Sequence, residues 1–313
     1  MKKVIFAKCS NDRADRFKIL TKIIDDNGHR YVEKHPLHKA AQAHIDSLSD
    51  TCVKLKELTD NTVFAMNNCN MDNGVACFEY LQGKTLEDIM KECFFKEDYE
   101  GLYKLFDRFV ENIQALADCK FTMSEGFEEV FGAVDISEDE AAVSVADIDL
   151  VTSNIIVDEQ AWHVIDYEWT FDFAVPVRFI IYRSIYGFMH VIGNYGNCEK
   201  LKLYDRVSMD QEEVQQYQLM EEAFQRYVAD GYYTLNQMYG VFGKRCIKVC
   251  DMVGEQLNDI PYRELLEEKN LLSDDKAKLE EENARLKAEL EEIYKSKKWK
   301  LVQKLAKLRT GGK

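Results

Sequence analysis

Proline and glycine are scarce in this chain of 313 residues, which holds 3 and 15 of them. That scarcity excludes a collagen-like fibre and argues against a loop-rich protein. Long apolar runs are also missing, since no window approaches eighteen consecutive apolar residues. The stretch "FIIYRSIYGFMHVIG" contains Arg183, so it predicts a buried helix of a soluble domain. The first apolar run is interrupted by Lys8 and is too short for a secretory signal.

Paired cysteine motifs are absent as well. The 9 cysteines are an odd number without any CxxC pair, and only Cys246 and Cys250 stand at helical spacing. Scattered thiols of this kind predict reduced, buried cysteines of a cytosolic protein rather than a disulfide framework or zinc site. The formal net charge of -15 disfavours non-specific binding to nucleic acid, so no nucleic-acid partner is expected.

What the chain does contain is enough apolar surface for a packed core, with 46% hydrophobic and 12% aromatic residues. Residues 1–34 alternate as strands, and Asn27-Gly28 predicts a hairpin turn between the second and third of them. The pattern becomes helical from Lys39, and two further strands are expected at 62–68 and 74–81. Helices dominate from Thr85 onward, which together predicts an α+β class: a small five-stranded antiparallel half and a mainly helical half.

A short segment, "DIDLVTSNIIVDEQAWHVIDYEW" at 147–169, interrupts the helical half. Residues 155–157 and 164–165 are apolar and predict two short buried strands, joined by a turn at Asp158-Glu159-Gln160. Strands of this kind can hold carboxylates at the mouth of a cleft. Asp149 and Asn154 precede the first strand, and Asp166 follows the second.

These residues match the parts that phosphoryl transfer requires: a lysine for nucleotide phosphates, oxygen ligands for Mg²⁺ and a carboxylate for the acceptor hydroxyl. Lys34 lies in the third strand, Asp149 and Asn154 fit the pattern D-L-x-x-x-N, and "IDYE" places Asp166 where D-F-G begins. In this order the set resembles the protein-kinase-like fold over residues 1–255, in its aminoglycoside-phosphotransferase and lipopolysaccharide-kinase-like branch. Singly, Asp149 and Asp166 read equally as turn carboxylates at strand ends.

The resemblance implies ATP and Mg²⁺ as cofactors and a role for each matching residue. Asp149 would be the catalytic base, Lys34 would bind the α- and β-phosphates, and Asn154 and Asp166 would hold Mg²⁺. Glu168 would be a possible ligand of a second metal ion. The backbone of Glu79, Tyr80 and Leu81, in "CFEYLQGKTLEDI", would meet adenine.

Several positions depart from that pattern. The first hairpin, "KCSNDRADRFKI", lacks a glycine-rich loop, so that Asn11, Arg13 or Arg16 would have to contact phosphate instead. The helix after Lys34 has no Glu at the usual place; Gln42, His44 and Asp46 are the candidates to partner Lys34, and we favour Asp46. Asp147 and Ile148 replace the usual His and Arg before the catalytic Asp. The segment after Asp166 has no room for a peptide-binding loop, which favours a small hydroxyl compound or a glycan as substrate.

Beyond Pro261 the composition changes to Glu, Lys and Leu. A heptad places Leu265, Leu272, Leu279, Leu286 and Ile293 at d positions, with polar residues such as Asn283 at a. This pattern predicts a coiled coil at 259–293 that forms a parallel homodimer through 262–293. The alternative is a single solvated helix.

The last residues, 294–313, form a basic tail with eight Lys or Arg and no acidic side chain. Trp299 and several Leu gather on one half of a helical wheel, which predicts an amphipathic helix on an anionic membrane through 295–309. Docking on the protein's own acidic surface is the alternative. The order of kinase-like halves (1–81 and 82–258), coil and tail is similar to that of bacterial polysaccharide chain-terminating kinases.

The leading hypothesis is therefore an ATP- and Mg²⁺-dependent kinase that phosphorylates a hydroxyl of a sugar or lipid-linked glycan, at the inner face of the cell membrane, in surface polysaccharide synthesis. The competing hypothesis is a pseudokinase scaffold that tethers polysaccharide-synthesis enzymes through its coil. A small-molecule kinase of the aminoglycoside or choline type would leave the coil and tail unexplained.

Overall fold

The protein is described by a computed structural model in which the chain forms two compact units, Met1–Gly254 and Glu255–Lys313. Within the second unit the described residues are helical. Among the described residues no helix has the length and apolarity needed to cross a membrane. The structure describes residues 2–10, 12–60, 62–158, 160–193, 198–231, 276, 278–279 and 282–287.

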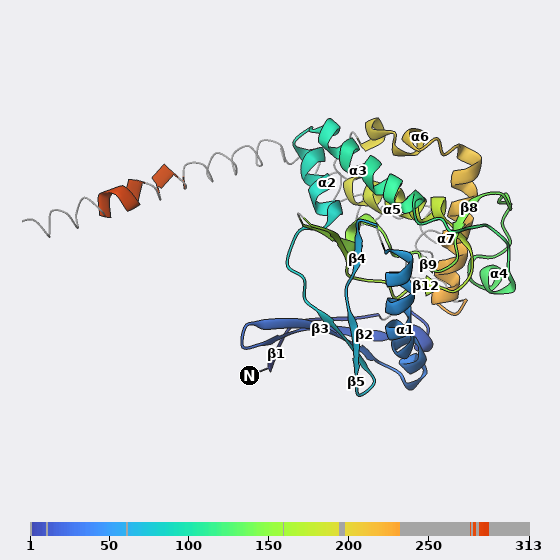
Figure 1. The fold of residues 1–313 in the computed structure, drawn as a ribbon, viewed down its shortest axis with the longest axis horizontal. Coiled ribbons are helices and arrows are strands. Elements are labelled where there is room, and N and C mark those ends of the chain that lie inside the picture. The colour runs from blue at the N-terminus through green and yellow to red at the C-terminus, as the bar shows by residue number, and fades with distance from the viewer. Residues whose placement is uncertain are drawn as a thin grey trace, which may run out of the picture. The chain divides into compact units, whose positions relative to one another are not determined.

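The N-terminal lobe of the first unit is built on a five-stranded antiparallel sheet with the order β1-β2-β3-β6-β5 (Figure 1). The turn between β2 and β3 uses Asn27 and Gly28 with φ of 56° and 92°, as the sequence predicts for a hairpin. The strands are β1 (Lys2–Cys9), β2 (Ile19–Asp26), β3 (His29–Pro36), β5 (Cys69–Asp72) and β6 (Val75–Glu79).

One helix, α1 (Gln42–Leu58), follows the third strand and covers this sheet, as predicted. Its buried residues are Ile45, Leu48, Cys52 and Leu55, whose helical spacing gives one apolar stripe. The stripe packs on β5 and β6, where Ala76 and Phe78 are buried. Two 3₁₀ turns, η1 (Asp15–Phe17) and η2 (Lys39–Ala41), flank β2 and α1.

The prediction of a sheet strand over 62–68 was wrong in part. Only β4 (Phe64–Met66) is extended there, and it pairs in parallel with β11 (Trp162–Val164) rather than with the five-stranded sheet. The edge position in that sheet belongs to β5 instead. Phe64 and Met66 are buried, and the ring of Phe64 packs against that of Trp162 in β11, with centroids 6.1 Å apart.

The two short strands predicted around 155–165 are confirmed as β10 (Ile155–Val157) and β11, an antiparallel hairpin. The Asp158 carboxylate closes the turn by accepting from the backbone N–H of Gln160 and Ala161. With β4 the hairpin forms a three-stranded sheet between the N-terminal sheet and the helices (Figure 1).

Helices make up most of the C-terminal lobe, and side-chain caps mark where several of them begin. The hydroxyls of Thr85 and Ser124 and the carboxylates of Asp98 and Asp210 accept backbone N–H groups at four helix starts. The helices are α2 (Leu86–Phe95), α3 (Tyr99–Gln114), α4 (Glu125–Phe131), α5 (Val177–Ile192), α6 (Leu203–Arg206) and α7 (Gln211–Val228), with the 3₁₀ turns η3 (Thr152–Asn154) and η5 (Cys198–Leu201).

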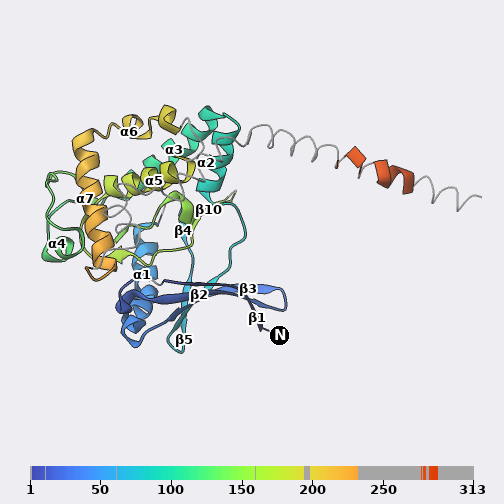
Figure 2. The same cartoon turned by 180° about the vertical axis from the view of Figure 1, so that it is seen from behind.

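Helix α5 is the buried helix that the sequence predicts. It is packed by α3, α6 and α7 (Figure 2) and buries nine of its sixteen residues. Its start follows a short segment after Asp166 that folds into β12 (Thr170–Phe171) and β13 (Val175–Pro176). These pair with β9 (Ala146–Asp147) and with β8 (Ala141–Val143), which also pairs with β7 (Cys119–Lys120).

Candidate functional site

Lys34 reaches from the N-terminal sheet into the C-terminal lobe. It lies in β3 between Thr21 of β2 and Ala76 of β6, and its side chain is only 6% exposed. Its Nζ donates to Asp166 Oδ1 at 2.6 Å and to Glu168 Oε2 at 3.2 Å. Burial alone would lower the pKa of Lys34, but the two carboxylates outweigh it and raise the pKa. The lysine is therefore held as a buried cation.

Asp166 and Asn154 lie together at one end of the β10–β11 hairpin. The backbone N–H of Ile165, beside Asp166, donates to the carbonyl of Asn154 at 3.0 Å. The Asn154 side-chain amide donates to the backbone oxygen of Asp149 at 3.0 Å, which ties the hairpin to the preceding loop. Asp166 is 34% exposed, and so it is accessible while still bonded to Lys34.

These two residues offer hard oxygen atoms for a cation. Within the described residues, the Asn154 amide oxygen and Asp166 Oδ2 accept no hydrogen bond, and they provide the oxygen ligands that Mg²⁺ prefers. The described part of the chain contains no group of three or more His, Cys, Asp or Glu placed to hold a metal ion. A Mg²⁺ ion held by one carboxylate, one amide and the oxygens of a nucleotide fits this donor set.

Asp149 is held from within the C-terminal lobe. Arg183 of α5 donates to Asp149 Oδ1 at 3.0 Å and to the backbone oxygen of Ile148 at 2.6 Å. The same guanidinium donates to Glu221 of α7 at 2.9 Å. Burial raises the pKa of Asp149 to about 6, although the charge of Arg183 opposes the shift. A carboxyl group of this kind is suited to accept a proton near neutral pH.

Asp147 occupies the place of the histidine that usually precedes the catalytic Asp. Its side chain is buried, and Oδ1 accepts from the backbone N–H of Asp149 at 3.0 Å. Burial and the charge of Asp149 raise the pKa of Asp147 well above its usual value. Asp147 therefore supports the loop that carries Asp149 through this hydrogen bond.

The segment expected to meet adenine follows β6. The Glu79 carbonyl accepts from the Asn67 side-chain amide at 2.9 Å, and Tyr80 lies under the guanidinium of Arg30 at 5.8 Å. Leu81 is half-buried. Two residues after Leu81 the chain packs closely at Gly83, where an added Cβ would come within 2.6 Å of the Ile156 side chain. The segment is therefore pressed against the hairpin that carries Asn154 and Asp166.

The structure does not bring Asp46 to Lys34. Asp46 is exposed on α1, and its carboxylate accepts from Gln42 at 2.8 Å. Of the three candidates on this helix it is His44 that lies near the site: its ring packs 5.1 Å from that of Trp169, and the charges of Glu168 and Lys34 reach it. Helical periodicity shows which residues of α1 share a face of the helix. It does not show which of them is turned toward Lys34.

One contact of the site was missed by the sequence analysis. Arg13 donates to Glu168 Oε1 at 2.5 Å, across 155 residues of sequence. Two features of the sequence could have pointed to this contact: the first hairpin lacks glycines, and Glu168 follows Asp166 at i+2. Of the other loop candidates, Arg16 stacks on Phe17 and Tyr227, and Asn11 lies outside the described residues.

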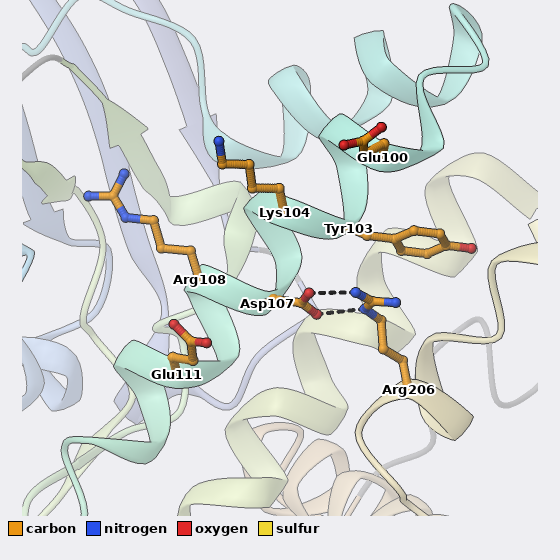
Figure 3. A pocket seen from close by; sticks show the side chains of 7 residues that line it. All are labelled: Glu100, Tyr103, Lys104, Asp107, Arg108, Glu111 and Arg206. Atoms are coloured by element: carbon orange, nitrogen blue, oxygen red, sulfur yellow. Dashed lines mark hydrogen bonds and ion pairs between the residues drawn. The ribbon is translucent and has the colours of Figure 1, made fainter.

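A separate hollow lies along α3 and the end of α6 (Figure 3), and none of the predicted site residues lines it. Asp107 and Arg206 face each other there through two hydrogen bonds, at 2.6 and 2.5 Å. The Arg206 guanidinium also lies 4.3 Å from the ring centre of Tyr103. The other lining residues are Glu100, Lys104, Arg108 and Glu111.

The five-stranded sheet with one helix, the segment after β6 and the mainly helical second lobe define an α+β protein-kinase-like fold, the class that the sequence predicts. The buried lysine of β3 meets the Asp after the β10–β11 hairpin, as that class requires. No family model matches the chain, and no curated protein matches it.

Among solved structures, the chain is similar to a thermostable mutant of aminoglycoside phosphotransferase APH(4)-Ia in a ternary complex with ADP and hygromycin B, at 11% identity and a TM-score of 0.44 (81% of this chain, 94% of that chain). Choline kinase LicA from Streptococcus pneumoniae gives 11% and 0.38 (76% and 87%). A macrolide 2'-phosphotransferase type I gives 13% and 0.34 (82% and 92%). At identities this low, the function has to be inferred from the residues of this chain itself.

Proposed function

We propose that the protein is an ATP- and Mg²⁺-dependent phosphotransferase that acts on a hydroxyl group. The observation that carries this proposal is the 2.6 Å contact between Lys34 Nζ and Asp166 Oδ1, which joins the two lobes beside Asp149 and Asn154. A purely structural ion pair would not need an adjacent carboxyl group with a raised pKa and an adjacent amide oxygen.

Each residue has a role in that reaction. Lys34 binds the α- and β-phosphates, and the backbone of Glu79, Tyr80 and Leu81 receives adenine. Asp166 and Asn154 hold Mg²⁺, which when bound neutralises charge on the phosphate oxygens. Asp149 orients the acceptor hydroxyl and takes its proton, while Arg183 fixes the position of its carboxylate.

A sugar or lipid-linked glycan is the proposed acceptor. Only a short segment separates Asp166 from α5, and it pairs into β12 and β13, so a loop that binds an extended peptide has no place there. A compact hydroxyl substrate is compatible with this arrangement. A role in bacterial surface polysaccharide synthesis is proposed from the resemblance in the order of kinase-like lobes, coil and tail.

The C-terminal segments are proposed to form a parallel homodimer through 262–293 and to hold the protein on the inner face of the membrane through 295–309. Leu279 and Leu286, both at d positions of the heptad, are 60% and 45% exposed, which supports pairing with a second helix. Most of the predicted coil, and all of the tail from 294, lie outside the described residues.

The alternative is a pseudokinase scaffold that tethers polysaccharide-synthesis enzymes through its coil. Arg13, in the loop where glycines are usual, lies on Glu168 beside the lysine, and this contact favours the alternative if it blocks nucleotide entry. The two functions differ in chemistry, because a scaffold transfers no phosphate.

The test is transfer of phosphate from [γ-³²P]ATP to a panel of sugars and lipid-linked oligosaccharides by the full-length chain. Labelled product with wild type, and about a hundredfold or more less with Asp149→Asn, is the expected result. Wild-type protein that binds ATP but labels no acceptor and releases no ADP would favour the scaffold. Sedimentation of full-length protein and of residues 1–293 with anionic liposomes tests the tail, and equal pelleting would contradict its membrane role.

A further inference from the structure

Both carboxylate oxygens of Glu168 accept hydrogen bonds from cationic side chains of the protein. Its side chain is 5% exposed, Oε2 accepts from Lys34 at 3.2 Å and Oε1 accepts from Arg13 at 2.5 Å. A carboxylate enclosed in this way is bound to cations of the protein itself.

Helix α1 provides no acid at the place where a kinase-like fold usually carries the partner of its lysine. The residue of α1 near Lys34 is His44, whose ring packs between Phe17 and Trp169 at centroid distances of 5.3 and 5.1 Å. Burial lowers the pKa of His44 to about 4, so this ring is neutral at pH 7. The compensating charge for Lys34 must therefore come from another element.

Arg13 is a second cation at the same place, and it is fixed there. The adjacent Ala14 N–H donates to the Val228 carbonyl at 2.8 Å, and the Arg13 guanidinium stacks 5.1 Å from the Trp169 ring. One nitrogen of the guanidinium, Nη1, is buried without a hydrogen-bond partner among the described residues. A buried N–H of a charged group without a partner costs free energy, and the Arg13 side chain is 23% exposed, which leaves part of it open to an anion.

We propose that Glu168 replaces the missing helix acid as the partner that positions Lys34, and that Arg13 replaces the glycine-rich loop as the group that binds the nucleotide's phosphates. The inference rests on the proposed function and names which residues receive the nucleotide. It assigns the metal to Asp166 and Asn154 alone and takes Glu168 out of the metal site.

Arrangement and charge support this division of roles. Lys34 and Arg13 come from two elements of the N-terminal lobe, β3 and the β1–β2 loop, and converge on one carboxylate of the C-terminal lobe. A glycine-rich loop offers backbone N–H groups to phosphate oxygens, whereas a guanidinium offers N–H groups and a charge. Asp166 shares Lys34 with Glu168 but is 34% exposed, so that it is accessible to a nucleotide-bound cation.

The experiment is a titration of full-length protein with the fluorescent analogue mant-ATP, once in EDTA and once over a range of Mg²⁺ concentrations. The variants are Glu168→Gln, Arg13→Gln, Arg13→Lys and Asp166→Asn. The matched control is Arg16→Gln, because Arg16 lies in the same loop but stacks on Phe17 and Tyr227 instead.

Loss of one charge-assisted hydrogen bond predicts that Glu168→Gln and Arg13→Gln each weaken mant-ATP binding about tenfold in EDTA. Their double variant should be little weaker than either alone, and Arg13→Lys should restore part of the affinity. Neither change should move the Mg²⁺ midpoint of the mant-ATP signal, which Asp166→Asn should raise. Arg16→Gln should bind as wild type does.

Two results would contradict this inference, and a third would contradict the proposed function on which it rests. If Glu168→Gln leaves binding in EDTA unchanged but raises the Mg²⁺ midpoint as Asp166→Asn does, Glu168 is a metal ligand and the inference is wrong. The inference is also wrong if Arg13→Gln, on the partly exposed loop and with a wild-type melting temperature, binds mant-ATP as wild type does. Wild-type protein that binds no mant-ATP under any condition would overturn the proposed function itself.

Discussion

The two aspartates of the site, Asp149 and Asp166, are held by different parts of the molecule. The side-chain partner of Asp149 is Arg183, which belongs to the same lobe and is itself bonded to Glu221. Asp166 is bonded to Lys34 of the opposite lobe. Asp149, proposed to meet the acceptor, is thus held within one lobe, whereas the Lys34–Asp166 contact, proposed to meet the nucleotide, needs both lobes.

The largest effect on activity is expected from a substitution of Asp166, the residue that joins the two lobes through Lys34. Asp166→Asn removes the charge that Lys34 and the proposed Mg²⁺ share, so that nucleotide affinity and turnover should both fall. We expect kcat/KM for phosphoryl transfer to decrease about 10³-fold or more. Steady-state ADP release measures this, and a decrease of less than tenfold would contradict the assignment of Asp166.

A substitution of Asp149 should lower turnover without weakening the binding of nucleotide. Asp149→Asn keeps the shape of the side chain but removes the proton acceptor, so kcat should fall about 10²- to 10⁴-fold. Affinity for mant-ATP should stay within about twofold, because Asp149 contacts neither Lys34 nor Arg13. A large loss of nucleotide affinity in this variant would show that the two aspartates are not independent.

Arg183, which holds Asp149, is also expected to contribute to the free energy of unfolding. Arg183→Gln leaves the partly buried carboxylates of Asp149 and Glu221 without their cation, and loss of hydrogen bonds to a charged group costs about 1.5 to 3 kcal/mol. Urea unfolding of the variant should therefore show a lower midpoint. Arg226→Gln on the exposed side of α7 is the control and should unfold as wild type does.

The smallest expected effect belongs to an ion pair between the lobes at the surface. Lys54 of α1 lies 2.6 Å from Asp172 of the segment after Asp166, and both side chains are exposed. Solvent screening limits such pairs to less than about 1 kcal/mol. Lys54→Ala should leave kcat unchanged and the unfolding midpoint nearly so; a clear drop in either would mean that this contact helps to hold the lobes together.

The sequence predicted the fold well where local patterns decide it. Alternation and the Asn27-Gly28 turn identified the first three strands, and helical spacing from Lys39 identified the helix α1. The segment around Phe64 was assigned to the wrong sheet because alternation gives the faces of a strand but not its neighbour. That neighbour, β11, is almost a hundred residues further along the chain.

The candidate site was predicted in part for a similar reason. Asp149, Asn154, Asp166 and Lys34 could be named because their order and spacing follow a known pattern. The contacts of Arg13 and Glu168 could not, since nothing local relates a loop residue to an acid 155 positions later. Asp46 was the favoured partner of Lys34, but the rotation of α1 presents His44 toward Glu168 and Lys34 instead.

The hydrogen bond from Ala14 N to the Val228 carbonyl has a consequence for biosynthesis. The loop between the first two strands is fastened to the end of α7, so its anchor emerges from the ribosome more than two hundred residues after the loop itself. Contacts of such long sequence separation form late and slowly. A nascent chain that ends before α7 would hold its first hairpin without this anchor, and full protection of that hairpin from protease should await synthesis of the helix.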